Sequence, residues 1–142
     1  MLRLHHLLFS AFALSCLEPA AQESSPSPTG EAYTAVVDWP RLPPGKALGR
    51  VYSVAVAPSG EIFVAHGADG QAANSEPIGG DTIFVFEPST GAFVRSFGGG
   101  LFRLPHAITF DAAGNLWVTD SDAGEIVELD ARGSVLARLG AP

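Results

Sequence analysis

A strand–turn–strand pattern that occurs twice is the feature that most constrains the fold of this 142-residue chain. Apolar residues alternate at period two on both sides of a glycine turn, and the helical period of 3.6 is absent after Arg50. When Gly60 is aligned with Gly114, every apolar position of the first unit falls on an apolar position of the second. We expect the strands beside these turns at 54–56, 62–64, 108–110 and 116–118.

Two more strands follow in each unit. Third strands are expected at 82–86 and 125–129, and fourth strands at 92–97 and 134–139. Four antiparallel strands joined by tight turns and repeated at about 40–50 residues are typical of a β-propeller blade. The sequence therefore predicts an all-β fold of about two four-stranded blades, at about 50–98 and 104–140.

The first 36 residues do not resemble the blades. Residues 1–21 combine a positive charge at Arg3 with an apolar run at 7–17 that is too short to span a bilayer, which predicts a secretory signal peptide. Residues 22–36 form a Pro/Ser-rich spacer and lead-in, and 37–142 the partial propeller. We expect a secreted or periplasmic protein.

Cys16 leaves an alternative open. It is the only cysteine and follows Ala13-Leu14-Ser15 at the end of the apolar run, where a bacterial lipoprotein signal keeps the cysteine that is lipidated. A protein that is anchored to a membrane by a lipid on Cys16 is therefore the second prediction for its location.

Charge and hydropathy exclude two classes of partner. Lys and Arg number 8 against 15 Asp and Glu, the net charge is −7, and no basic run occurs, so we expect no nucleic-acid partner. No apolar stretch reaches the roughly 18 residues of a spanning helix, so we expect no transmembrane span.

Few residues have the chemistry of a site. His106 opens the first strand of the second unit, and the first strand of a blade lines the central channel, where a neutral imidazole is a natural zinc ligand. A hydrogen-bonded loop histidine is the alternative, since one histidine does not make a zinc site. His66 and Asp120 end the two second strands, where polar caps are the default interpretation.

An insert at 65–80 distinguishes the first unit from the second. It is polar and glycine-rich, and insertions on a repeat scaffold often lie on the binding face, although a neutral surface loop explains it equally well. Carboxylates near the loops could hold calcium, but no known ligand spacing is present. They are Asp69, Glu76, Asp81, Asp120 and Asp122.

The order of several short motifs gives a resemblance to a known family. It covers residues 37–140, and the motifs are Asp38-Trp39-Pro40, 74–78 (NSEPI), 81–86 (DTIFVF), 100–106 (GLFRLPH) and 114–120 (GNLWVTD). This order resembles the N-terminal portion of the peptidyl-α-hydroxyglycine α-amidating lyases, which are six-bladed propellers of the NHL-repeat kind. The joint run is specific, whereas single NHL-type motifs are common.

The resemblance implies a lyase that cleaves the N–C bond of a C-terminal α-hydroxyglycine and releases a peptide amide and glyoxylate. It implies zinc held by three histidines on different blades, of which His106 matches the first, and a structural calcium, of which Ile108 matches a backbone-carbonyl ligand. His66 and Asp69 are the candidate substrate-binding residues for a peptide substrate or ligand.

Departures from the family limit this interpretation. Gly67 stands where the family has an arginine that handles substrate, Ala107 replaces a glycine, and Gly124-Glu125 replace a His-Gln pair. The other two zinc histidines and the catalytic tyrosine belong to later blades, so we expect an N-terminal fragment that is inactive as a single chain and binds neither metal tightly. The alternative is an exported, non-catalytic NHL-repeat module that binds peptide, protein or glycan. Assembly of copies into a closed ring is the least favoured possibility.

Overall fold

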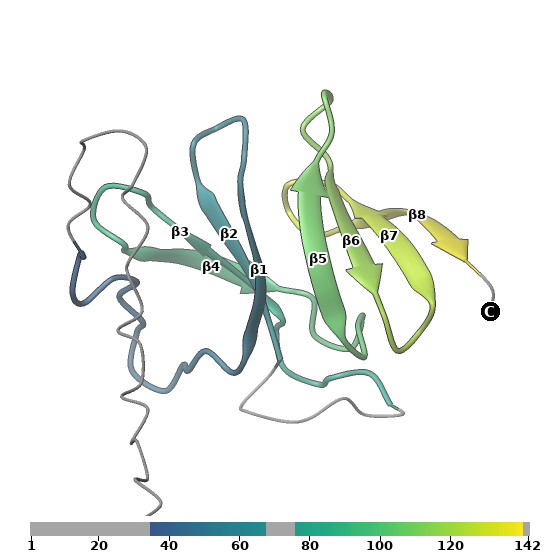
Figure 1. Ribbon diagram of the computed structural model, residues 1–142, viewed down its shortest axis with the longest axis horizontal. Helices are drawn as coiled ribbons and strands as arrows, with labels where there is room; N and C mark the ends of the chain where they lie inside the picture. The colour runs from purple at the N-terminus through teal and green to yellow at the C-terminus, as the bar shows by residue number, and fades with distance from the viewer. Residues whose placement is uncertain (1–34, 68–75, 141–142) are drawn as a thin grey trace, which may run out of the picture. The chain divides into compact units, whose positions relative to one another are not determined.

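The computed structural model describes residues 35–67 and 76–140, and these residues form two four-stranded sheets with no helix. Blade 1 consists of β1 (Val51–Val56), β2 (Ile62–His66), β3 (Ile83–Phe86) and β4 (Phe93–Phe97). Blade 2 consists of β5 (Pro105–Phe110), β6 (Leu116–Asp120), β7 (Glu125–Leu129) and β8 (Val135–Gly140). Each sheet follows chain order and is antiparallel throughout (Figure 1). The predicted all-β fold of two blades is confirmed.

The two blades repeat one another in backbone detail. The turn between the first two strands has a glycine at positive φ in both blades, +90° at Gly60 and +86° at Gly114, a conformation that residues with a Cβ rarely adopt. A register shift near the start of the first strand, and another between the third and fourth strands, occur at equivalent places in both blades. The repeat offset of 54 residues that aligns the two glycines therefore also aligns the first two strands of the blades.

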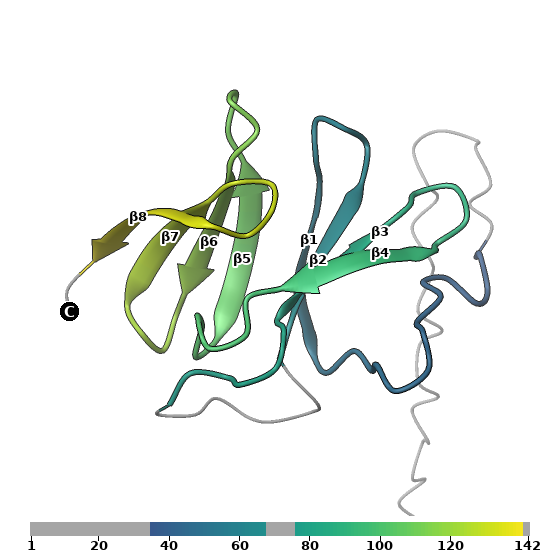
Figure 2. The same cartoon turned by 180° about the vertical axis from the view of Figure 1, so that it is seen from behind.

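The main core lies between the blades, and β1 and β5 lie side by side in both views (Figures 1 and 2). Because strand side chains alternate in direction, one face of each sheet supplies the core. Phe63 is fully buried there, with ring centroids of Phe110 and Phe97 at 4.9 and 6.2 Å. The buried members are Ala57, Phe63, Ala65, Ile83, Val85, Phe102, Ile108, Leu116, Val118, Val127 and Leu129.

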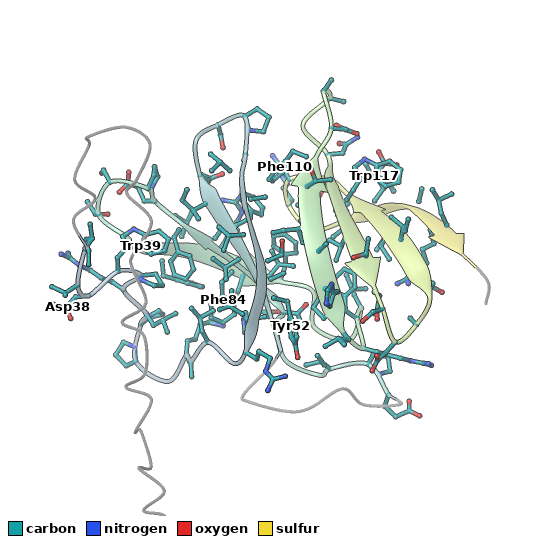
Figure 3. The ribbon with its side chains drawn as sticks, in the orientation of Figure 1. Asp38, Trp39, Tyr52, Phe84, Phe110 and Trp117 are labelled. Atoms are coloured by element: carbon teal, nitrogen blue, oxygen red, sulfur yellow. The ribbon has the colours of Figure 1, made fainter. Side chains whose placement is uncertain are left out.

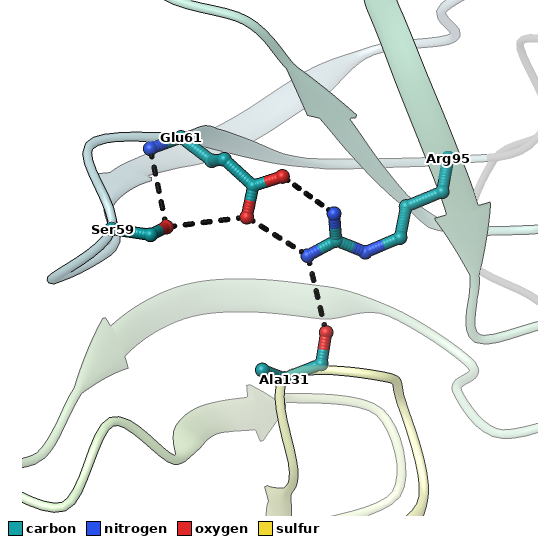
Figure 4. A network of polar contacts seen from close by, with 4 residues as sticks. All are labelled: Ser59, Glu61, Arg95 and Ala131. Atoms are coloured by element: carbon teal, nitrogen blue, oxygen red, sulfur yellow. Dashed lines mark hydrogen bonds and ion pairs between the residues drawn. The ribbon is translucent and has the colours of Figure 1, made fainter.

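One polar network also joins the blades. Arg95 donates two hydrogen bonds to the carboxylate of Glu61, at 2.6 and 3.1 Å, and a third to the backbone carbonyl of Ala131 in blade 2 at 3.2 Å (Figure 4). The guanidinium also lies over the ring of Phe63, 5.4 Å from its centroid. The hydrogen bond from Arg95 lowers the pKa of Glu61 from its ordinary value, despite partial desolvation.

Residues 37–50, which precede β1 and are called the lead-in from here on, cover the other face of blade 1 over β2–β4. Trp39, which is labelled in Figure 3, packs with Leu42 and Leu48 against a second apolar cluster, in which Phe86 is fully buried. The peptide N–H of residue 41 donates to the carbonyl of Gly91 at 2.8 Å. Gly91 is needed at this point, because a Cβ there would lie 2.5 Å from the Trp39 ring. Blade 1 is thus covered by blade 2 on one face and, over β2–β4, by the lead-in on the other, whereas among the described residues nothing covers the far face of blade 2.

Candidate functional site

The innermost strands bring two aromatic rings together. His106 is the second residue of β5 and is exposed, and its ring centroid lies 6.0 Å from that of Tyr52, the second residue of β1. Tyr52 lies where the two blades adjoin (Figure 3). An imidazole can accept or donate a proton, and a tyrosine offers a ring face and a hydroxyl. The pair can therefore contact a polar ligand on the inner side of the blades.

A buried carboxylate fixes the backbone that leads into His106. Asp120 is 2% exposed and accepts hydrogen bonds from the N–H groups of Arg103 and Leu104 at 2.6 and 3.0 Å. It also accepts two from the β6–β7 turn at 3.1 and 3.2 Å. Buried Pro105 then restricts φ immediately before the histidine. Asp120 is therefore a structural anchor that positions His106, and its oxygens are already engaged.

His66 occupies the equivalent end of β2 but is held differently. It is 1% exposed, and its Nδ1 lies 2.8 Å from the carbonyl oxygen of Gly67. The N–H of Gly49 lies 3.3 Å from the same Nδ1, so which of the two contacts is a hydrogen bond depends on the tautomer of the ring. The ring stands edge-on to Phe84, with centroids 4.3 Å apart.

A charged pair lies beside His66 at a cavity of about 120 Å³ under the lead-in. Lys46 Nζ lies 3.7 Å from an Asp81 carboxylate oxygen and donates to Ser96 Oγ at 3.0 Å, and that hydroxyl donates to Asp81 at 2.5 Å. Lys46 also lies over the ring of Phe84, 5.2 Å from its centroid. The charges of Lys46 and Asp81 offset one another, so the cavity wall carries no net charge from this pair.

The described residues do not fit a zinc ion. No three His, Cys, Asp or Glu side chains within 35–67 and 76–140 gather closely enough to hold a metal. Catalytic zinc takes three protein ligands, and His106 supplies one. Of the three zinc histidines that the resemblance implies, this part of the chain contains the position of one, and zinc binding stays a prediction.

Ile108 lies where its carbonyl is directed away from its own sheet. Its N–H donates to Ser53 Oγ at 3.2 Å, across to blade 1. The N–H and C=O of one strand residue point to the same edge, so the carbonyl also faces away from β6. Calcium takes six to eight oxygens, and one carbonyl does not define such a site. The role of Ile108 stays a prediction.

Comparison with known proteins identifies relatives of this chain. No model of a protein family matches it. Peptidylglycine alpha-amidating monooxygenase of Rattus norvegicus is 31% identical over 134 residues, which cover 83% of this chain and 13% of that protein. Peptidyl-alpha-hydroxyglycine alpha-amidating lyase 2 of Drosophila melanogaster is 31% identical over 123 residues, 76% and 30% of the two chains. Peptidyl-glycine alpha-amidating monooxygenase A of Xenopus laevis is 32% identical over 107 residues, 66% and 11%.

The chain is a sequence relative of the peptidyl-α-hydroxyglycine α-amidating lyases. The resemblance expected from the motifs is thereby confirmed. The chain spans about 13% of the rat amidating monooxygenase and 30% of the fly amidating lyase.

Gly67 occupies the position at which the resemblance to the amidating lyases places an arginine. In the structure Gly67 is buried, and its N–H donates to the carbonyl of Arg50 at 2.9 Å. Asp69, the partner expected for His66 in substrate binding, lies outside the described residues, as does Cys16. Substrate binding by His66 and Asp69 and lipidation at Cys16 stay predictions.

Two residues beside the expected site residues, Tyr52 and Lys46, were not predicted from the sequence. Tyr52 beside His106 could have been found, because the repeat offset of 54 residues that aligns Gly60 with Gly114 also aligns Tyr52 with His106. Lys46 beside His66 left no such signal, since it lies in a Pro/Gly-rich stretch with no strand period. The end of the insert, by contrast, is anchored: Ile78 exchanges backbone hydrogen bonds of 2.7 Å with Gly100 and Phe102 in the segment that joins the blades.

Proposed function

We propose that this chain forms part of the substrate-facing surface of an amidating-lyase-type propeller and that, as a single chain, it releases no glyoxylate. The observation that carries the proposal is the exposed imidazole of His106 on an innermost strand beside Tyr52, in a relative of the amidating lyases. The match of His106 to the first zinc-ligand position of the family supports it.

The chemistry explains why one imidazole is too little. Cleavage of a C-terminal α-hydroxyglycine removes the hydroxyl proton, forms the aldehyde C=O of glyoxylate and breaks the N–C bond. The electron pair of that bond and a proton go to the nitrogen of the new amide. Such a step needs groups positioned to take and to give protons. Of the described candidates, His66 and Asp120 are buried in structural contacts, which leaves His106.

An assay for glyoxylate tests this proposal directly. A peptide that ends in α-hydroxyglycine is incubated with the full chain, and we expect no release above buffer. His106→Ala and the exposed-turn control Arg132→Ala should behave alike. Release by the wild-type chain that His106→Ala abolishes would overturn the claim of inactivity.

A binding measurement tests the claim that this surface faces substrate. In NMR spectra, the ring signals of His106 and Tyr52 should shift when a peptide ending in α-hydroxyglycine is added, and the same peptide ending in an amide should shift them less. Unchanged ring signals with both peptides would show that this surface does not face substrate.

The metals of the family form a separate part of the proposal. Zinc and calcium are implied by the resemblance, and we propose that this chain alone holds neither tightly, because His106 and the carbonyl of Ile108 are single ligands. Calorimetric titration with Zn²⁺ should show no tight 1:1 binding. A tight 1:1 complex that His106→Ala removes would contradict this.

The second candidate is an exported, non-catalytic NHL-repeat module that binds a peptide, a protein or a glycan. Gly67 favours it, because loss of the family's arginine removes a strong anion contact. The two candidates differ in what they require of a ligand. A binding module should take up peptide or glycan without a C-terminal α-hydroxyglycine, and the amide peptide above then binds equally well.

For location, we propose export directed by residues 1–21, to a secreted or periplasmic site, with lipid anchoring through Cys16 as the alternative. The part of the chain that the structure describes contains no helix that is both long and apolar enough to cross a bilayer. Fractionation of a bacterial host expressing the chain separates the possibilities. Anchoring predicts a membrane-bound form that Cys16→Ser releases, and retention of unprocessed chain in the cytoplasm would contradict export.

A further inference from the structure

Arg50 is the residue immediately before β1, and its side chain is exposed. Among residues 35–67 and 76–140, no hydrogen bond or ion pair engages its guanidinium. Arg95 and Arg138, by contrast, form ion pairs of 2.6 Å with carboxylates of their own blades. The positive charge of Arg50 is therefore available to an anion from solution.

Strand pairing indicates the face on which the side chain of Arg50 begins. The N–H of Gly67 donates to the carbonyl of Arg50 at 2.9 Å, which extends the β1–β2 ladder by one pair. Side chains alternate along a strand, and residues directly opposite one another share a face. Phe63 and Ala65 lie on the face of β2 that packs against blade 2, and position 67 continues that alternation. Arg50 therefore begins on the face that adjoins blade 2, opposite a glycine that leaves room beside it.

The same edge of the blades carries Tyr52 and His106. Their ring centroids are 6.0 Å apart, and Tyr52 lies where the two blades adjoin (Figure 3). One step further along, Ser53 Oγ accepts a hydrogen bond from the N–H of Ile108 at 3.2 Å, so β1 and β5 run side by side in the same direction. Arg50, two residues before Tyr52, thus lies at the edge from which both innermost strands begin. A guanidinium, a phenol and an imidazole come from this one edge.

The chemistry of the three groups suits the end of a peptide. In an α-hydroxyglycine the hydroxyl and the carboxylate are attached to the same carbon, so a ligand whose hydroxyl meets one group of this edge presents its carboxylate to a neighbouring group. A guanidinium binds a carboxylate through two parallel N–H···O hydrogen bonds, a geometry that an ammonium cannot match.

We propose that Arg50 binds the C-terminal carboxylate of a peptide ligand and makes this surface selective for peptides with a free carboxyl end. The identity of that peptide, one that ends in α-hydroxyglycine, rests on the proposed function. The carboxylate contact itself is a property of Arg50, of its place beside Tyr52 and of the glycine opposite it.

Arg103 is the competing candidate, because it lies three residues before His106 and its guanidinium has no ion pair among the described residues. It lines a different hollow, of about 220 Å³, together with Glu125 and Arg138. A ligand carboxylate in that hollow would meet the carboxylate of Glu125, which Arg138 already neutralises at 2.6 Å. The charges therefore favour Arg50 over Arg103.

A titration of the full chain with two matched peptides tests the proposal. Both end in α-hydroxyglycine, one with a free carboxylate and one with its methyl ester, which keeps the hydroxyl and removes the charge. The NMR signals followed are the Nε–H of Arg50 and the rings of Tyr52 and His106. The variants are Arg50→Gln, Arg50→Lys, the competitor Arg103→Gln and the distant control Arg132→Gln, with circular dichroism to verify folding.

We expect the wild-type chain to bind the acid about tenfold more tightly than the ester, as loss of one charge-assisted contact predicts. Arg50→Gln should bind the two peptides equally. Arg50→Lys should retain part of the preference, because the charge remains without the paired geometry. Arg103→Gln and Arg132→Gln should retain all of it.

The outcomes separate this proposal from the proposed function. A preference that Arg50→Gln leaves unchanged, or that Arg103→Gln removes, overturns the role of Arg50, while ring signals that still respond to peptide support the proposed function. Silent rings beside an Nε–H signal of Arg50 that shifts only with the acid would support the carboxylate contact and contradict the proposed function. A wild-type chain in which none of the three signals responds to either peptide overturns both.

Discussion

Blade 1 and blade 2 share strand order, turns and register shifts, yet they differ in what covers them. Blade 1 has the lead-in on one face and blade 2 on the other, and Phe63 and Phe86 on its two faces are both fully buried. Among residues 35–67 and 76–140, blade 2 has a partner on one face only, and Trp117, the equivalent of Phe63, is half-buried. Period-two patterning therefore specifies which side chains share a face, while burial depends on the neighbouring element, as in other repeat proteins.

The ends of the second strands differ as well. Asp120 holds the chain by hydrogen bonds from four backbone N–H groups, whereas the ring of His66 packs on Phe84 and its Nδ1 contacts backbone groups of Gly49 and Gly67. The anchored backbone in blade 2 leads directly into His106. The equivalent ends of β2 and β6 are thus held by different kinds of interaction.

The largest expected effect separates Phe63 from Trp117. Phe63→Ala removes a ring packed between the blades and should lower the free energy of unfolding by about 3–5 kcal/mol. Trp117→Ala removes a ring from an open face, together with one hydrogen bond from its indole N–H to Asp111 at 3.0 Å, and should cost about 1 kcal/mol. Urea unfolding followed by circular dichroism measures both. Equal costs would mean that the far face of blade 2 is covered in solution.

An intermediate effect is expected at Asp120. Asp120→Ala leaves buried N–H donors without acceptors and should cost about 2–3 kcal/mol. Asp120→Asn keeps one oxygen as an acceptor and should cost less. Amide hydrogen exchange should accelerate at Arg103 and Leu104 before it does so in β2, where His66 serves as the internal comparison. Uniform acceleration across both blades would contradict a local anchoring role.

The smallest effect concerns Glu61, whose equivalent in blade 2 is the uncharged Asn115. Its pKa is lowered in the folded state, so its ion pair with Arg95 stabilises the fold above the ordinary pKa and is lost as pH falls through the lowered value. Both groups are partly exposed, so the contribution should be below about 1 kcal/mol. Glu61→Gln should be less stable than wild type at pH 7 and nearly equal to it near pH 3. A gap that persists at pH 3 would assign the effect to packing instead.

Much of the fold could be predicted, because it depends on local patterns. The alternation in 54–56 and 62–64, the turn glycine between them and their second occurrence specify two sheets without further information. The cover on blade 1 could not be predicted, because Trp39 lies in a Pro/Gly-rich stretch, and its contact with Gly91 joins residues about fifty positions apart. No local sequence pattern indicates such a contact.

The site was only partly predictable for the same reason. His106 is identified by its strand position, and Tyr52 follows from the repeat. The burial of His66 depends on Phe84 and on the lead-in above it, which come from other segments. A polar residue at a strand end looks the same in the sequence whether it faces solvent or lies under a covering segment.

The lead-in has a consequence for the order in which the protein is made. Its residues precede β1, so the segment that covers β2–β4 on the far face of blade 1 already exists when a ribosome finishes β4. Only the other face of blade 1, with Phe63 at its centre, must wait for strands synthesised later. The two sheets can therefore fold in the order in which they are synthesised, because the first sheet provides the apolar face against which the strands of the second sheet pack.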